Sequence, residues 1–320
     1  MITKIIGTGS CAGSRRVTNQ ELEQLVETSD EWIHSRTGIS TRYLAQEEGS
    51  CAMAAEAAKK ACAQAGVSPK ELDLILLATS TPENCFPSEA CQVQGRIGAD
   101  HAVAFDISAA CSGFIFALHT VHSFLVSGTY RTALVIGVDE LSKAVDWSDR
   151  RTCVLFGDGA GACVVRAEKE GRFCSTIGSD GSRGDILTCQ ARSGGNFLTG
   201  KRPELGFIAM DGQEVFKFAV KKVPACIEEM LEKEGEKKEN IRFYLLHQAN
   251  ERIIETVAKR LGEPVEKFPM NIGQYGNTSA ASIPILFDEL NQEGKLKRGD
   301  KLVLAGFGAG LTWGSILLEW

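Results

Sequence analysis

The chain alternates between short apolar runs and longer segments in which apolar residues recur with helical spacing. Several of the short runs lack a polar face, which is typical of strands covered on both sides of a sheet. The predicted strands are Leu72–Ala78, Ala102–Ile107, Ala133–Val138, Ile241–Leu246 and Lys301–Ala305. Because helical segments separate them, the pattern predicts an α/β fold with largely parallel sheets.

Residues at the segment ends mark the predicted helices. The segments Ser50–Ala65 and Cys111–Ser127 are each followed directly by a glycine, and a glycine at that point readily takes the left-handed conformation that ends a helix. A further helical pattern begins near Gly212, but Pro224 interrupts it. Since proline removes a backbone donor, we expect either two helices or one kinked helix there.

The second half of the chain repeats short patterns of the first half in the same order. The matches pair Leu74–Leu77 with Phe243–Leu246, Ser108–Cys111 with Ser279–Ser282, Leu134–Ile136 with Leu302–Leu304, and Gly159–Gly161 with Gly308–Gly310. The offsets are 169, 171, 168 and 149 residues, so the first half carries about twenty extra residues between Val138 and Gly157. The repeat predicts two related halves, residues 1–170 and 171–320, with a site where their strand ends converge.

Composition and charge limit the possible functions. The length of 320 residues, with 43% hydrophobic and 24% charged residues, fits a folded protein. A net charge of −6 gives no overall positive field, so we expect no nucleic-acid partner. The 11 cysteines show no metal-ligand spacing, so we expect reduced thiols, no metal and no cofactor. Without an apolar signal segment or membrane span, the expected location is the cytoplasm.

Cys111 has the position of a nucleophile in the first half. It follows the apolar strand Ala104–Ile107 and the small-residue turn Ser108–Ala110, and it begins the helix that stops before Gly128. The N–H groups and positive dipole at a helix start favour a thiolate over a thiol, and small neighbours let a substrate approach. A cysteine between small residues is more often an ordinary buried side chain, which is how we interpret the other ten.

The second half offers His247 and Asn277. His247 directly follows the strand Ile241–Leu246, and strand ends are where α/β sites collect functional residues. Asn277 lies in the polar turn Tyr275–Ser279 before a further helix. Taken singly, an asparagine there is more simply a helix cap, and a histidine is more simply a structural side chain. Their placement opposite Cys111 favours a shared site.

Two other interpretations of these motifs fail on their context. A cysteine, a histidine and an asparagine also form the site of papain-like proteases, but the protease signature around the cysteine is absent and duplicated α/β halves are foreign to that fold. The run Gly157–Gly161 suggests a phosphate loop. It is followed by the β-type run Ala162–Val165 instead of a helix, so we expect no nucleotide there.

Seven motifs resemble those of one family, in the order in which that family carries them. They are Glu31–Gly38, Phe86–Gln92, Asp106–Gly113, Phe156–Gly161, His247–Asn250, Gly276–Ser279 and Gly306–Gly314. The chain resembles β-ketoacyl-(acyl carrier protein) synthase III, of the thiolase-like superfamily, over essentially its whole length. The resemblance implies a thiolase-like fold with two duplicated βα halves in an α-β-α-β-α layered architecture.

The resemblance also implies a reaction and the residues that perform it. Cys111 attacks an acyl-CoA, CoA leaves, and decarboxylation of malonyl-carrier protein supplies the carbon nucleophile that completes a Claisen condensation. His247 and Asn277 hold the enolate oxygen as neutral donors, and the backbone N–H groups of Cys111 and Ala309 receive the second oxyanion. The family often has glycine at Ala309, but a backbone donor tolerates alanine if the local φ is negative.

Binding residues follow from the resemblance as well. For CoA and substrate they are Trp32, Arg36, Thr37, Arg151, Gly212, Phe216 and Asn250. Those expected to contact the carrier protein are Lys217, Gln248, Ala249, Asn250, Glu251, Arg252 and Lys259. Trp32 and Arg151 are suited to flank an adenine ring. Phe86 corresponds to a side chain that reaches the acyl pocket of the other subunit, which implies a homodimer.

Three functions remain open from the sequence. The first is a ketoacyl synthase that initiates fatty acid synthesis. The second is a relative in secondary metabolism that uses another acyl donor or acceptor, and the residues of the pocket do not separate it from the first. The third is a scaffold without activity, which the intact set of Cys111, His247 and Asn277 disfavours.

Overall fold

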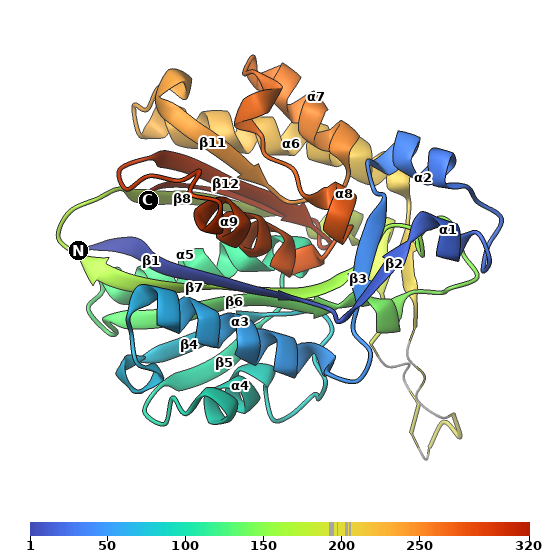
Figure 1. Cartoon of the computed structure of the whole chain (residues 1–320), viewed down its shortest axis with the longest axis horizontal. Coiled ribbons are helices and arrows are strands. Elements are labelled where there is room, and N and C mark those ends of the chain that lie inside the picture. The colour runs from blue at the N-terminus through green and yellow to red at the C-terminus, as the bar shows by residue number, and fades with distance from the viewer. Residues whose placement is uncertain (192–194, 197, 202–203, 205) are drawn as a thin grey trace.

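Two mixed sheets and three layers of helices make up the fold of the computed structural model, which describes residues 1–191, 195–196, 198–201, 204 and 206–320 (Figure 1). The first sheet has the order β1 (Ile2–Ala12), β7 (Asp158–Glu168), β6 (Thr132–Glu140), β4 (Leu74–Ala78), β5 (Val103–Ile107). The second has the order β11 (Ile241–Leu246), β12 (Lys301–Gly308), β13 (Thr312–Glu319), β8 (Phe173–Ser179). The layered α/β fold predicted from the sequence is confirmed.

Helices cover both outer faces and fill the space between the sheets (Figure 1). The helices on the outer faces are α3 (Gly49–Ala65) and α4 (Glu89–Ile97) on the first sheet, and α6 (Gly212–Lys233) and α7 (Glu251–Leu261) on the second. The central pair is α5 (Gly113–Val126) and α9 (Ser282–Gln292). Their side chains share one apolar core with both sheets, so burial of this core holds the two halves together.

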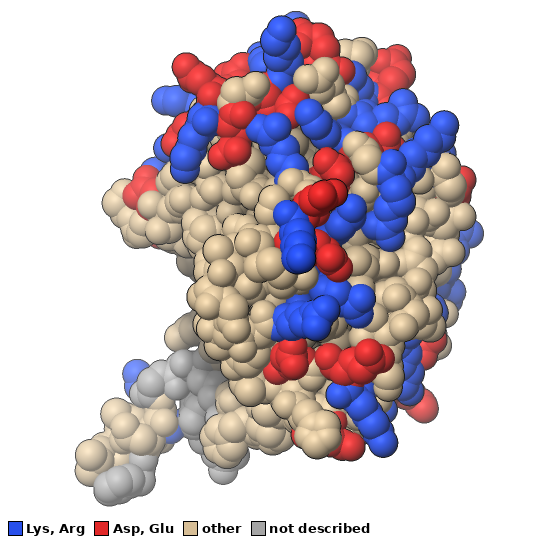
Figure 2. Space-filling model, turned by 90° about the vertical axis from the view of Figure 1, so that its left-hand side faces the viewer, with Lys and Arg blue, Asp and Glu red and all other residues tan. Residues whose placement is uncertain are grey.

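Smaller elements surround the open side of these layers. They are β2 (Arg15–Thr18), α1 (Asn19–Leu22), α2 (Asp30–Thr37), β3 (Thr41–Leu44), β9 (Leu187–Cys189), β10 (Ile208–Met210) and α8 (Ile272–Tyr275). The strands β2 and β3 pair with each other, as do β9 and β10. None of the helices in the described residues is long and apolar enough to cross a membrane. Basic and acidic side chains are intermixed on the face shown in Figure 2.

The predicted strands are all present, but the expectation of largely parallel sheets is wrong. The strands β4, β5 and β6 pair in parallel, as do β11 and β12. The remaining pairings in the two sheets are antiparallel. The reason is that β7 and β13 return directly beside β6 and β12, and a hairpin return needs no helical crossover.

The predicted helices also form, with one difference at an end. Pro224 lies inside the continuous helix α6, so of the two expected alternatives the structure has the single helix. The segment predicted to begin at Cys111 starts as a 3₁₀ turn, Ala110–Ser112, and becomes regular α-helix at Gly113. Gly128 ends it with φ of 76°, as predicted.

The two halves repeat the same topology. The order β4-β6-β7-β1 of the first sheet corresponds to β11-β12-β13-β8 of the second. A 3₁₀ turn precedes each central helix, and its first residue has a left-handed backbone, with φ of 47° at Ala110 and 52° at Ser279. The equivalent of Cys111 is therefore Ala280, whereas the sequence match had paired Cys111 with Ser282. The division into domains at residue 170 stays a prediction.

Candidate active site

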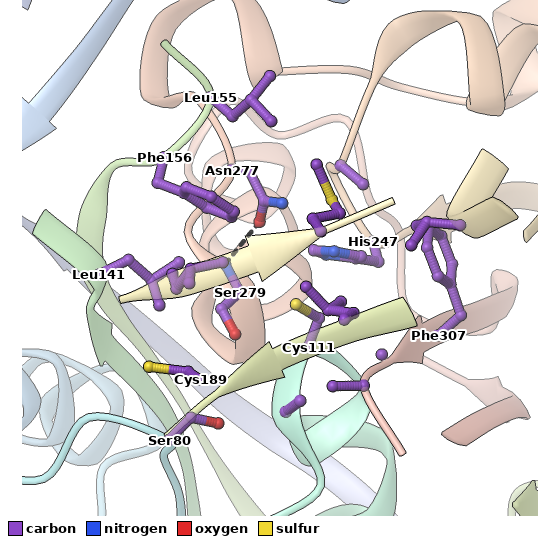
Figure 3. A pocket seen from close by; sticks show the side chains of 18 of the residues that line it. Ser80, Cys111, Leu141, Leu155, Phe156, Cys189, His247, Asn277, Ser279 and Phe307 are labelled. Carbon is purple, nitrogen blue, oxygen red and sulfur yellow. Dashed lines mark hydrogen bonds between the residues drawn. The ribbon is translucent and has the colours of Figure 1, made fainter. Parts of the chain in front are cut away.

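A cavity of about 710 Å³ lies between the halves at the ends of their strands. Cys111 from the first half lines it together with His247, Asn277 and Ala309 from the second. Figure 3 shows the Cys111 thiol, the His247 ring and the Asn277 amide directed toward this common space. The structure thus brings together the four residues that the sequence assigned to the chemistry.

Cys111 sits in the 3₁₀ turn Ala110–Ser112, partly exposed to the cavity. Burial raises the pKa of its thiol to about 12, although a hydrogen bond from Ser279 acts in the opposite direction. Burial of the thiol therefore acts against the thiolate that the helix start was expected to favour. The cause is that desolvation of a buried anion outweighs the few donors near the sulfur.

His247 is buried at the end of β11 and held in one orientation. Its Nδ1 lies 2.7 Å from the Ser282 hydroxyl oxygen, and the backbone N–H of Gln248 donates to the same oxygen at 3.4 Å. The hydroxyl hydrogen is then free to donate to Nδ1, which leaves the proton of the ring on Nε2. Burial lowers the pKa of His247 to about 3, so the ring is a neutral hydrogen-bond donor near pH 7.

Asn277 is fixed by the strand-like pairing of its backbone with Phe156. Its N–H donates to the Leu155 carbonyl at 2.9 Å, and its own carbonyl accepts from the Gly157 N–H at 3.0 Å. The side-chain Oδ1 accepts from the Ser279 N–H at 2.9 Å, drawn as a dashed line in Figure 3. The residue is thus a cap, and its Nδ2 group remains as a donor on the cavity side.

The turn after β12 brings backbone close to Cys111. A Cβ atom on Gly308 would lie 2.8 Å from the Cys111 nitrogen, so only a glycine allows this approach. The described non-glycine residues with positive φ are Ala110 and Ser279, so the φ of Ala309 meets the condition for an alanine there. The Ala309 backbone therefore lies on the cavity next to the turn that carries Cys111.

The residues predicted to bind CoA divide into two groups. Arg36, Thr37, Gly212, Phe216 and Asn250 line the cavity. The ring of Trp32 carries two guanidinium groups, that of Arg36 at 5.1 Å and that of Arg150 at 5.2 Å. Arg151, in contrast, pairs with Asp149 at 2.9 Å and its side chain is 81% exposed. The structure places Arg150 rather than Arg151 next to Trp32, and the sequence reasoning missed Arg150.

The residues predicted to contact a carrier protein are also differently placed. Ala249 and Asn250 line the cavity, while Arg252 and Lys259 are exposed on α7 and Glu251 packs against Gly38. Lys217 is exposed and pairs with Glu214 at 2.8 Å. Gln248 is buried, and its amide bonds to the Leu246 carbonyl and the Asn271 N–H, so its side chain does not reach the surface.

Sequence reasoning missed several polar groups around the site. Ser282 holds the His247 ring, and Ser279 lines the cavity with its N–H bonded to Asn277. Asp139 is fully buried at the end of β6. The rule that singled out His247, a polar residue directly after an apolar run, would also have found Asp139. Phe86 lies outside the cavity and is 85% exposed in the single chain.

Comparison with known proteins places this fold and cavity in a family. Residues 105–181 match the family described as 3-oxoacyl-(acyl-carrier-protein) synthase III, and residues 231–320 match its C-terminal part. A Clostridium acetobutylicum protein named β-ketoacyl-(acyl-carrier-protein) synthase III is 49% identical over 99% of this chain and 98% of its own length.

Solved structures agree with this match. The 3-oxoacyl-(acyl-carrier-protein) synthase III of Aquifex aeolicus superposes with a TM-score of 0.93 at 49% identity, covering 99% of this chain and all of that one. The Pseudomonas aeruginosa enzyme of the same name has a TM-score of 0.93 at 39% identity, covering 100% and 98%.

Fold and site together define a condensing enzyme of the thiolase-like class, an acyltransferase. The chain belongs to the β-ketoacyl-(acyl-carrier-protein) synthase III family, as its sequence motifs predicted.

Proposed function

We propose that this chain transfers an acyl group from acyl-CoA to Cys111 and condenses it with malonyl-carrier protein, which gives 3-oxoacyl-carrier protein, CoA and CO2. Such a reaction would initiate fatty acid synthesis. The observation that carries the proposal is the convergence of Cys111, neutral His247 and the Asn277 amide on one cavity. The proposed reaction uses no cofactor, because acyl transfer and condensation both take place on thioesters.

In the first half-reaction, the Cys111 thiolate attacks the carbonyl carbon of the acyl-CoA thioester. The backbone N–H groups of Cys111 and Ala309, which also receive the oxyanion of the condensation, receive the oxyanion that forms here, and its collapse expels the CoA thiolate. The acyl group then stays in the cavity as a thioester of Cys111. Apolar walls from Leu141, Phe156 and Phe307 keep water from it.

In the second half-reaction, loss of CO2 from the malonyl group places negative charge on its thioester oxygen. His247 donates from Nε2 and Asn277 from Nδ2, and two neutral donors stabilise an enolate without having to take up a proton. The enolate carbon attacks the acyl-enzyme, and Cys111 leaves as a thiolate. The low pKa of His247 supports this role, because the ring stays neutral over the working pH range.

The proposed substrates would enter past the residues on the rim of the cavity. Arg36 and Trp32 are suited to hold the nucleotide end of CoA, with Arg150 over the same indole ring. The exposed side chains of Arg252 and Lys259 on α7 are suited to meet an acidic carrier protein. We further propose a homodimer in which the exposed Phe86 packs against the partner subunit.

Mass spectrometry of the Cys111 peptide tests the proposed function. The protein is exposed to a panel of straight, branched and aromatic acyl-CoAs, and malonyl-carrier protein is then added. We expect an acyl adduct on Cys111 that disappears on this addition as 3-oxoacyl-carrier protein forms. Absence of an adduct with every donor would overturn the proposal, and an adduct cleared only by a different acceptor would favour the alternative reaction.

A further inference from the structure

Two hydroxyl groups lie between the turns that carry the backbone donors Cys111 and Ala309. The Ser112 residue directly follows Cys111, and its hydroxyl oxygen lies 2.7 Å from that of Thr312. Thr312 begins β13 and pairs with Gly308 across the hairpin whose turn contains Ala309. The contact between the two hydroxyl groups therefore crosses from the first half of the chain to the second.

Two backbone carbonyl groups are further partners of this hydroxyl pair. The Ser112 hydroxyl donates to the Ala109 carbonyl oxygen at 2.7 Å. The Thr312 hydroxyl reaches the Ala309 carbonyl oxygen at 2.9 Å and that of Ala109 at 3.3 Å. The pair thus contacts the backbone two residues before Cys111 on one side, and the backbone of the second oxyanion donor on the other.

Two hydroxyl hydrogens serve these contacts, which limits their directions. If each hydroxyl donated to the carbonyl of its own turn, the two hydroxyl oxygens would lie 2.7 Å apart with no hydrogen between them, which is repulsive. In one favourable arrangement Ser112 donates to Thr312, which donates to Ala309. In the other, Thr312 donates to Ser112, which donates to Ala109. A hydrogen bond between side chains joins the two turns in both cases.

The backbones of the two turns pack closely, with no side chain between them at the point of contact. A Cβ atom on Gly308 would lie 2.8 Å from the Cys111 nitrogen. On its other side the hairpin is held by backbone bonds, in which the Leu311 N–H donates to the Asp180 carbonyl at 2.8 Å and the Asp180 N–H donates to the Leu311 carbonyl at 2.7 Å. Packing limits how close the turns come, whereas the directional hydroxyl bonds resist sliding of one turn past the other.

We propose that Thr312 and Ser112 are positioning residues for the oxyanion site, and that their hydroxyl pair sets the relative position of the Cys111 and Ala309 N–H groups. Such donors act only when both lie about 2.7 to 3.1 Å from the oxygen that becomes negative. The proposal rests on the proposed function, since the oxyanion forms only if Cys111 is the nucleophile. Because the same two N–H groups serve both half-reactions, the pair should affect acyl transfer and condensation alike.

Alkylation separates the positioning of the N–H groups from support of the thiol. Iodoacetamide reacts with Cys111 by forming an S–C bond to a saturated carbon and expelling iodide, so no oxyanion develops. Attack on an acyl-CoA carbonyl does develop one, and it needs the two N–H donors. The alkylation rate therefore reports the reactivity and access of the thiol, and the acyl-transfer rate reports these together with the oxyanion site.

Parallel measurement of CoA release and of iodoacetamide alkylation in Thr312→Val tests the proposal. Valine has nearly the shape of threonine and lacks the hydroxyl. We expect the maximal rate of acyl transfer to fall by about 10- to 100-fold, less than the loss of a whole oxyanion donor. Formation of 3-oxoacyl-carrier protein from preloaded enzyme should fall by a similar factor. The acyl-CoA concentration at half-maximal rate and the alkylation rate should stay within about twofold.

Two further variants serve as rescue and control. Thr312→Ser restores a hydroxyl and should recover most of the lost rate. Ser315→Ala removes a buried hydroxyl of the same strand, one that bonds to the Cys226 carbonyl at 3.2 Å, and should leave acyl transfer and alkylation unchanged.

Ser112→Ala examines the pair from the other turn. It removes the bond between the hydroxyl groups but leaves Thr312 free to donate to one carbonyl at a time. We expect acyl transfer to slow by about 3- to 10-fold, which corresponds to one net hydrogen bond, with alkylation again within about twofold. Should Thr312→Val fail to fold, this variant decides alone.

The pattern of losses separates the alternatives. Equal losses in acyl transfer and alkylation would show that the pair only supports the Cys111 turn, and a normal rate of acyl transfer in Thr312→Val would show that its hydroxyl has no role. A raised half-maximal concentration with an unchanged maximal rate would make Thr312 a binding residue instead. Each of these results overturns the proposal. An unmodified enzyme that alkylates but acquires no acyl group would refute the proposed function itself, and with it the oxyanion that the pair serves.

Discussion

The two turns that begin the central helices have the same backbone and carry different chemistry. In the first half, Ala110 takes the left-handed conformation and the next residue is Cys111. In the second half, Ser279 takes it and the next residue is Ala280. At the strand ends the second half carries the functional residue. His247 follows β11, and the corresponding residue of the first half is Ala78 at the end of β4. One copy of the repeat thus presents a nucleophile, and the other presents the groups that surround it.

This division shows why neither half can form the site alone. In the turn with Cys111, the Ser112 hydroxyl bonds to the Ala109 carbonyl and to Thr312, and the turn with Asn277 has no thiol. The two turns lie next to each other between the halves, where a strand end of each half opens into the cavity. The comparison predicts that substitutions in the two turns affect different steps of the reaction.

The largest effect is expected at the first turn. Cys111→Ser should lower the rate of acyl transfer by on the order of 10⁴-fold or more, because the nucleophile itself is lost. The exposed Cys91→Ala is the matched control and should transfer acyl groups at the normal rate. Release of CoA from acyl-CoA measures the step. A Cys111→Ser enzyme that still formed an acyl adduct on another residue would contradict the assignment of the nucleophile to the first turn.

Next come the donors of the second half. His247→Ala and Asn277→Ala should each lower the rate of condensation by roughly 10²- to 10³-fold, since each removes one donor from the developing enolate. The rate of acyl transfer to Cys111 should stay within about threefold. The control is the exposed His101→Ala. Formation of 3-oxoacyl-carrier protein and CoA release, followed in parallel, give the two rates. Equal losses in both steps would show that the halves do not divide the reaction.

Equivalent glycines on β6 and β12 test how closely the halves approach. A Cβ atom on Gly137 would lie 2.2 Å from the Ala280 carbonyl oxygen, whereas on Gly306 the nearest atom would be 3.5 Å away. Gly137→Ala should therefore lower the free energy of unfolding by roughly 1 to 3 kcal/mol. Gly306→Ala serves as its control and should change it by less than about 1 kcal/mol. Urea unfolding measures the free energy of unfolding of both variants. Equal losses would contradict the closer contact at Gly137 than at Gly306.

The smallest effect concerns the support of the His247 ring. Ser282→Ala removes the hydroxyl that bonds Nδ1, so the proton can move from Nε2 to Nδ1 in part of the molecules. Condensation should slow by about 3- to 10-fold, which corresponds to one net hydrogen bond. Acyl transfer should not change. Nitrogen NMR of the ring gives the tautomer directly, and a ring that kept Nε2 protonated in the variant would contradict the role of Ser282.

Much of the fold could be predicted because it depends on local patterns. The strand Ile241–Leu246 has the predicted ends, and the glycine after Ala65 ends α3 as expected. The antiparallel strands β7 and β13 were harder, since an apolar run does not tell whether its neighbour is parallel. Pro224 left the number of helices in α6 open, and the structure has one because packing against the second sheet outweighed the local penalty of a proline.

The candidate site was predictable where one residue has an unusual position. Cys111, His247 and Asn277 follow strands or begin helices, and the structure brings them to one cavity. Ser279 and Asp139 were not found, because serine and aspartate are common and the bond from the Ala280 N–H to Asp139 crosses between the halves. The high pKa of Cys111 was also missed, since desolvation depends on tertiary packing that no local pattern contains.

The central claim is that the first half acquires the acyl group and the second half drives its condensation. The most direct test is the acyl occupancy of Cys111 in the double variant His247→Ala/Asn277→Ala, measured by intact-protein mass spectrometry. The enzyme is loaded with acyl-CoA, freed of excess donor, and mixed with malonyl-carrier protein. The account predicts full loading that persists after mixing, whereas the unmodified enzyme clears. Loss of the acyl group as 3-oxoacyl-carrier protein at the unmodified rate, or a failure to load, would contradict it.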